Sequence, residues 1–240
     1  MRLPLFALIL LSLAAQAADQ GSRTCRILFL NGPDDGPAKL QLFDGTSSQE
    51  VELTRMSFSP TYKIAPGELT LALFPKPPAP PETADDPPVI PPDAPKATLA
   101  AAISDFYLIA SSDPSNKVAP VKIQIINASI ENFKPGQMLW FNLTENTIRG
   151  VVGSQNLLIN PNSRTILDPP AAKQEDYHVN LQFLPAGKQR AEPLCETNWS
   201  QDFHSRSVYF VVNTGGILPR ILGFPDFRQP QKKDKEDVFR

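Results

Sequence analysis

Short apolar segments, broken by proline- and glycine-rich turns, constrain this chain more than any other feature. Residues 50–54 (EVELT) and 69–73 (LTLAL) alternate apolar and polar side chains, and 26–30 (RILFL) is an apolar run that ends at the turn cluster 31–37 (NGPDDGP). Such patterns are typical of β-strands. After the first 17 residues, no stretch repeats apolar residues at helical spacing. The sequence therefore predicts an all-β protein.

The proline-rich segment 75–95 interrupts this pattern. Nearly half of its residues are proline, and they are mixed with acidic side chains. Proline has no N–H to donate to a sheet, so the segment cannot form a central strand. We expect a long, extended loop inserted into a hairpin. The alternative is a proline-rich ligand for an aromatic groove on a partner.

The second half of the chain repeats features of the first. Three pairs of segments match in the same order: 26–32 (RILFLNG) with 122–128 (KIQIINA), 40–43 (LQLF) with 138–141 (MLWF), and 105–110 (DFYLIA) with 207–212 (SVYFVV). The matches are short, so chance similarity between hydrophobic strands is the alternative. Their common order favours an internal duplication.

The duplication predicts two tandem antiparallel β-sandwich units of immunoglobulin-like character, at residues 24–113 and 119–227. In the second unit the expected strands are 147–152, 156–159, 177–183 and 207–212. Segment 217–224 contains Pro219, which predicts an edge strand or an irregular tail. The polar residues 228–240 are expected to form a solvated C-terminal tail.

The turn residues between these strands resemble those of a known kind of protein. In the first half, 31–34 (NGPD) follows the opening strand, 43–45 (FDG) ends the next one, and Tyr62 and 66–67 (PG) precede 69–73. With 138–143 (MLWFNL) and 206–212 in the second half, this pattern is similar to exported bacterial proteins with tandem immunoglobulin-like β-sandwich repeats. No activity is assigned to that family, so the resemblance implies a fold and an exported location only.

Residues 1–17 have the features of a cleaved secretory signal peptide. Arg2 is followed by an almost unbroken apolar stretch, and 15–17 (AQA) places small residues at a cleavage site. The apolar run is too short for a transmembrane anchor. We therefore expect a periplasmic or extracellular protein without a transmembrane segment once the signal is removed. Its formal charge of −2 argues against a nucleic-acid partner, which would favour a basic chain.

The chain has two cysteines, Cys25 and Cys195. An even number of cysteines in an oxidising compartment predicts a disulfide between them. Two buried thiols are the alternative.

Residues suited to catalysis are sparse. The only histidines, His178 and His204, are far apart in sequence and lack the short ligand spacings of a zinc site. No nucleophile motif or phosphate-binding loop is present. The acidic pairs Asp34-Asp35 and Asp85-Asp86 lie in proline-rich turns, where acidic residues are common. We expect no catalytic residue, no metal and no cofactor.

Trp199 is the one candidate contact residue, because it lies in a polar segment near Cys195. An exposed tryptophan there would stack on a sugar or a partner, whereas a buried one would cover the end of the second sandwich. We favour an exported, non-catalytic binding or structural module whose partner is a protein or glycan of the cell envelope. The alternatives are a carbohydrate-binding module with exposed aromatic residues, and a hydrolase with an unrecognised site.

Overall fold

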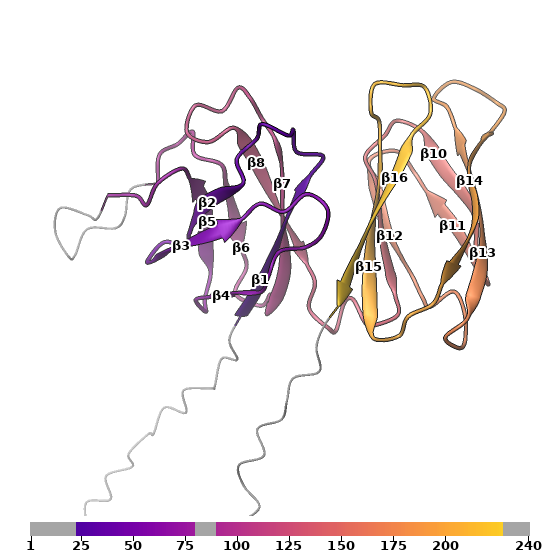
Figure 1. The fold of residues 1–240 in the computed structure, drawn as a ribbon, viewed down its shortest axis with the longest axis horizontal. Coiled ribbons are helices and arrows are strands. Elements are labelled where there is room, and N and C mark those ends of the chain that lie inside the picture. Colours follow the sequence, from indigo (N-terminus) through magenta and orange to yellow (C-terminus); the bar gives the residue numbers. More distant parts are fainter. Residues whose placement is uncertain (1–22, 80–89, 228–240) are drawn as a thin grey trace, which may run out of the picture.

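The computed structural model describes residues 23–79 and 90–227. Within them the protein is all-β, with sixteen strands and no helix, as the sequence predicts. Figure 1 shows two bodies side by side, each built from half of the strands. The predicted signal peptide, the middle of the proline-rich segment and the C-terminal tail lie outside the described residues.

Each body contains eight consecutive strands. The first unit consists of β1 (Arg23–Leu30), β2 (Lys39–Phe43), β3 (Ser48–Glu52), β4 (Tyr62–Ile64), β5 (Leu69–Phe74), β6 (Lys96–Leu99), β7 (Asp105–Ser112) and β8 (Val121–Asn127). The second unit consists of β9 (Met138–Asn142), β10 (Thr147–Val152), β11 (Gln155–Ile159), β12 (Ser163–Leu167), β13 (Asp176–Leu184), β14 (Glu192–Ser200), β15 (Ser205–Val212) and β16 (Arg220–Phe227).

The strand order of the first unit recurs in the second. The first unit has sheets of order β4-β1-β7-β8 and β3-β2-β5-β6, and the second has β12-β9-β15-β16 and β11-β10-β13-β14. Each strand of the second unit thus stands where the strand eight places earlier stands in the first. Even the exceptional pairings correspond, because β1 with β7 and β9 with β15 are the two parallel pairs among otherwise antiparallel neighbours.

Two of the three sequence matches join strands that are not equivalent. Segment 26–32 falls on β1 but 122–128 falls on β8, and 40–43 falls on β2 but 138–141 falls on β9. Only the match between β7 and β15 joins corresponding strands. The repeat is therefore visible in the strand order. The matches between short apolar segments, which have similar compositions, paired strands that do not correspond.

The boundary between the units also differs from the expected one. Residues 121–127, assigned from the sequence to the second unit, form β8 and pair with β7 from Phe106↔Asn127 to Ser112↔Val121. The segment near Asp113 is the turn of this hairpin, so it does not separate the units. The chain passes to the second unit between Asn127 and Met138.

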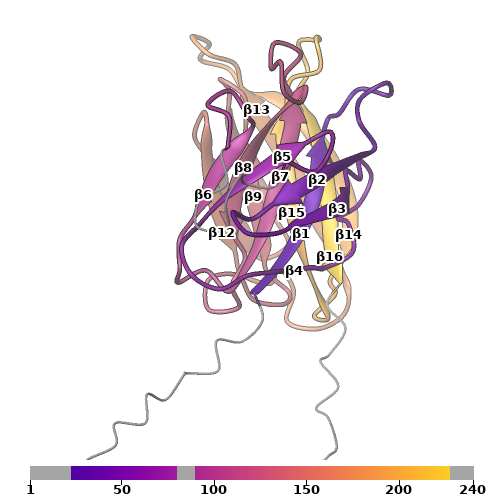
Figure 2. The same cartoon turned by 90° about the vertical axis from the view of Figure 1, so that its left-hand side faces the viewer.

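The four sheets form four layers. One hydrophobic core lies between the two sheets of each unit, and a third lies between the β1-containing sheet and the β9-containing sheet. These two we call the inner sheets, and the β2- and β10-containing sheets we call the outer sheets. The order outer, inner, inner, outer is visible from left to right in Figure 1, and Figure 2 looks along the stack onto the first unit.

Burial explains the different sequence patterns of inner and outer strands. All five residues of β9 are buried, and so are five consecutive residues of β7, because these strands are covered on both faces. Strand β13 of an outer sheet alternates buried with less buried residues along its length, since one face meets solvent. Continuous apolar runs therefore mark the strands at the centre of the molecule.

Candidate functional site

A buried cluster of charges closes one end of the seam between the inner sheets. Asp226, near the end of β16, is fully buried. Its carboxylate accepts hydrogen bonds from Arg26 Nη1 at 2.5 Å, from the Tyr107 hydroxyl at 2.5 Å and from Arg206 Nε at 3.0 Å. Arg26 and Tyr107 belong to the first unit, so this one carboxylate holds side chains of both units.

Arg206 completes the cluster. Its guanidinium also donates to the carboxylate of Asp105 at 2.7 Å and to the carbonyl oxygens of Ala128 and Phe133, both at 2.6 Å. The group is almost fully buried, and a buried charge is tolerated when it is paired and hydrogen-bonded in this way. We interpret the cluster as structural, because it fixes one inner sheet against the other.

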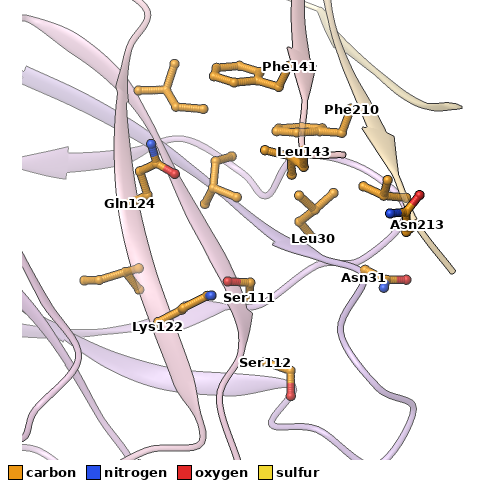
Figure 3. A pocket seen from close by; sticks show the side chains of 14 residues that line it. Leu30, Asn31, Ser111, Ser112, Lys122, Gln124, Phe141, Leu143, Phe210 and Asn213 are labelled. Atoms are coloured by element: carbon orange, nitrogen blue, oxygen red, sulfur yellow. The ribbon is translucent and has the colours of Figure 1, made fainter. Parts of the chain in front are cut away.

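At the opposite end of the seam the inner sheets leave a cleft of about 730 Å³. Its walls carry apolar side chains of both units: Leu30, Ile109, Ile123, Ile126, Phe141, Leu143, Phe210 and Val212. The rings of Phe141 and Phe210 stack with centroids 5.1 Å apart. Figure 3 shows these two rings on one side of the cleft and Gln124 on the other. The volume is within the range of small-molecule sites, about 300–1,000 Å³.

Polar groups are gathered among the same walls. They are Asn31, Ser111, Ser112, Lys122, Gln124 and Asn213. Lys122 is solvent-exposed and takes part in no salt bridge within residues 23–79 and 90–227. The lining contains no carboxylate, imidazole or thiol. The arrangement suits binding of a ligand with an apolar body and a polar or anionic group better than it suits acid–base chemistry.

Asn31 sets the shape of the cleft at the end of β1. It has a φ of 52°, a left-handed conformation that asparagine adopts more readily than most residues. There the chain turns into the loop whose first residues are 31–37 (NGPDDGP). This turn ends the inner strand at Leu30, and Leu30 and Asn31 both line the cleft.

Trp199 lies on β14 and is partly buried against the core of the second unit. Its ring stacks on Tyr209, with centroids 4.9 Å apart and an angle of 4° between the planes. Tyr209 in turn stacks on the buried Trp140 at 4.5 Å. Trp199 thus packs against the second core, and only part of its surface meets solvent.

The predicted disulfide between Cys25 and Cys195 is wrong. Cys25 is buried on β1 in the core of the first unit, and Cys195 is on β14, an edge strand of the far outer sheet. The two residues therefore lie in different layers of the stack, and no bond joins them. Burial raises the pKa of the Cys195 thiol, so the thiol stays protonated near neutral pH.

The remaining sequence candidates are not brought together. His178 on β13 is exposed and contacts Asn198, while His204 follows β14 and contacts Asp202. Asp34 and Asp35 are exposed in the loop after β1, and Asp85 and Asp86 lie outside the described residues. The described part of the chain contains no group of three or more side chains placed to hold a metal ion.

The charge cluster is the feature that sequence reasoning missed. Its signal is a charged residue at the border of a continuous apolar strand, as with Asp105 before 106–110 (FYLIA) and Arg206 before 208–212 (VYFVV). Which of these charges meet depends on how the two units pack, and a pattern along one strand does not contain that information.

Comparisons with known proteins give no match that bears on these sites. No known protein-family model matches the chain, and no curated protein matches it significantly. Residues 23–79 and 90–227 contain no helix long and apolar enough to cross a membrane.

Proposed function

We propose that this protein is an exported, non-catalytic binding module whose ligand occupies the cleft between the two units. The observation that carries the proposal is the cleft itself. It is a space of about 730 Å³ with apolar and polar walls, between two inner sheets that a buried charge cluster holds together at the other end. Such a preformed site binds without first ordering the protein around the ligand.

The ligand we propose is amphipathic, with an apolar chain or ring system and one anionic group. The apolar body would lie against Phe141, Phe210 and the aliphatic walls. The anionic group would face Lys122, whose ammonium has no carboxylate partner in the described residues, with Asn31 and Asn213 as further donors. A neutral or cationic group in that place would gain less from the lysine.

Two sequence features support an exported location. The segment 1–17 has the pattern of a signal peptide, and the strand punctuation resembles that of exported bacterial proteins with tandem repeats. We take each unit to be an immunoglobulin-like β-sandwich. In support of this, each consists of two four-stranded sheets that enclose one core.

Calorimetric titration with dodecanoate tests the proposal, because this probe has one apolar chain and one carboxylate. We expect saturable binding by the mature protein, and weaker binding of dodecylammonium, which carries the opposite charge. Lys122→Glu reverses the exposed charge at the cleft and should weaken dodecanoate binding by about tenfold, which corresponds to about 1.4 kcal/mol.

Lys188→Glu is the matched control, because Lys188 is an exposed lysine in the loop between β13 and β14. It changes the net charge by the same amount without touching the cleft lining. Absence of dodecanoate binding, or an equal loss of affinity in Lys122→Glu and Lys188→Glu, would count against the cleft as the site.

A further inference from the structure

The second unit has an open side between its two sheets. Strand β14 ends the outer sheet and β16 ends the inner sheet, so neither pairs with a further strand of the described residues on this side. Between them lies a groove of about 420 Å³, lined by Trp199 and Cys195 from β14, Ser207 and Tyr209 from β15, and Ile221, Gly223, Phe224 and Pro225 from β16. None of these side chains is charged.

The aromatic surface of this groove is held rigidly. Tyr209 lies parallel to both Trp199 and Trp140, at 4.9 Å and 4.5 Å between ring centroids. On the neighbouring strand, a Cβ at Gly223 would lie 2.7 Å from Cε1 of Tyr209, which is closer than such atoms approach. Glycine at this position therefore makes room for the Tyr209 ring, and the stack keeps Trp199 at the edge of the groove.

A smaller pocket of about 190 Å³ continues the groove toward the ends of β14 and β16. It shares Ser207, Tyr209 and Pro225 with the aromatic part and adds both polar residues, such as Gln201, and apolar ones, such as Met138. Asp202 is its one charged residue, and the hydrogen bond from the His204 backbone N–H holds the pKa of that carboxyl below its usual range.

Gln201 gives this pocket an unused acceptor. The residue is 3 % exposed, and Nε2 donates to the carbonyl oxygen of Gly136 at 3.3 Å. Its Oε1 is buried and has no hydrogen-bond partner among residues 23–79 and 90–227. Buried amide oxygens are normally paired, and an exception calls for an explanation such as an absent ligand.

We propose that this groove binds a neutral sugar ring, as one unit of a glycan. A sugar ring has an apolar C–H face and a rim of hydroxyl groups. Its C–H face matches the ring of Trp199, which Tyr209 supports from behind, and a hydroxyl group donates to Oε1 of Gln201, an acceptor without a partner among the described residues. The scarcity of charge favours a neutral sugar over an acidic one. This site is separate from the cleft between the units and does not depend on the function proposed for it.

Tryptophan fluorescence reports on this groove alone. The chain has only two tryptophans, Trp140 and Trp199, and both belong to the stack. The cleft lining contains neither of them. We expect a saturable change of emission when the mature protein is titrated with chitohexaose, cellohexaose or maltohexaose, and no such change with dodecanoate. No change with any of the three sugars would overturn the proposal.

Retention on the insoluble polysaccharides chitin and cellulose provides the second measurement. Trp199→Ala should abolish retention, while Trp199→Phe, which keeps an aromatic face, should restore part of it. Gln201→Leu removes the acceptor at nearly constant volume and should weaken binding at least tenfold, with the circular dichroism spectrum unchanged. Lys188→Glu, at an exposed residue outside both the groove and the cleft, is the control and should bind as the wild type does. Wild-type retention by Trp199→Ala would refute the groove as the site.

Discussion

The hydroxyl of Tyr107 donates a 2.5 Å hydrogen bond to the carboxylate of Asp226, although the two residues are 119 positions apart and belong to different units. Both side chains are fully buried. Together with the contacts from Arg26 and Arg206, this hydrogen bond makes Asp226 a buried link between the two inner sheets.

Replacing Asp226 by asparagine should therefore destabilise the whole molecule. The substitution leaves Arg26 and the buried Arg206 without their shared counter-charge, and breaking a buried ion pair costs about 3–5 kcal/mol. Urea unfolding followed by circular dichroism measures the loss.

Two controls accompany that variant. Tyr107→Phe removes one hydrogen bond and no charge, so its cost should be about 1 kcal/mol. Glu50→Gln breaks the exposed pair with Lys39, whose pKa that carboxylate raises, and should leave the unfolding midpoint unchanged. If Asp226→Asn unfolds at the same urea concentration as Glu50→Gln, the cluster does not have the role assigned to it.

Stability should fall at alkaline pH because of two buried tyrosines. Burial raises the pKa values of Tyr177 and Tyr209 above the ordinary value of about 10. Above that pH the unfolded chain loses its phenolic protons before the folded chain does, so the free energy of unfolding decreases as pH rises and levels off only beyond the folded pKa values. Below about pH 10 both tyrosines are protonated in the folded and the unfolded chain, so they add no pH dependence to the free energy of unfolding.

Urea unfolding at a series of pH values measures this effect, and phenolate absorbance should show incomplete ionisation of the four tyrosines in the folded protein. Tyr177→Phe should reduce the slope of stability against alkaline pH. An equal slope in wild type and Tyr177→Phe would contradict the assignment to Tyr177.

The cysteines should remain reduced in the mature protein. Because Cys25 and Cys195 lie in different layers, the intact mass should be the same with and without reductant, and both thiols should react with Ellman's reagent after unfolding. In the folded protein Cys195 should react slowly at neutral pH and faster as pH rises, since only the thiolate attacks and burial raises its pKa. A mass two hydrogens lower without reductant would show a bridge.

Deleting residues 80–89 should leave the fold intact. Strands β5 and β6 pair as antiparallel neighbours. Ile90 and Ala94, which follow the deleted segment, pack with Phe74, which precedes it. Shortening a loop between paired strands changes the closure entropy by about 1 kcal/mol or less. The unfolding temperature should shift by only a few degrees.

The same deletion tests the proline-rich segment as a partner contact. Proteins that crosslink to the full-length protein in the cell envelope should be lost when 80–89 is removed, if this segment is the proline-rich ligand of a partner. If the same partners crosslink with and without the segment, it is not the ligand of a partner, and its interpretation as an inserted loop stands.

The sequence predicts the all-β class and most strands because their apolar patterns are local. Strand β10 spans the predicted residues. Strand β16 overlaps the predicted segment 217–224 and is an edge strand, one of the two alternatives that Pro219 left open. Strand β14 was not predicted, since it is a mostly exposed edge strand whose polar residues carry no alternation. Its pairing with β13 alone makes it a strand.

The candidate sites depend on contacts that no local pattern contains. The cleft needs β1, β7 and β8 to face β9 and β15, and the sequence does not state which faces of the sheets meet. Trp199 was found because a tryptophan in a polar segment is unusual, but Gln201, two residues later, has no such signal. Val121–Asn127 was assigned to the wrong unit for the same reason: the sequence of a strand does not show which strand it pairs with.

The seam between the inner sheets makes the two repeats comparable to a dimer whose subunits are joined in one chain. Leu28, Tyr107 and Ile109 on one side pack against Leu139, Val208 and Phe210 on the other, as subunits of an obligate pair would. The link from Asn127 to Met138 makes their association intramolecular, at an effective concentration of about millimolar or more. A protein of this kind does not dissociate on dilution, so its cleft persists at concentrations where two separate subunits would come apart.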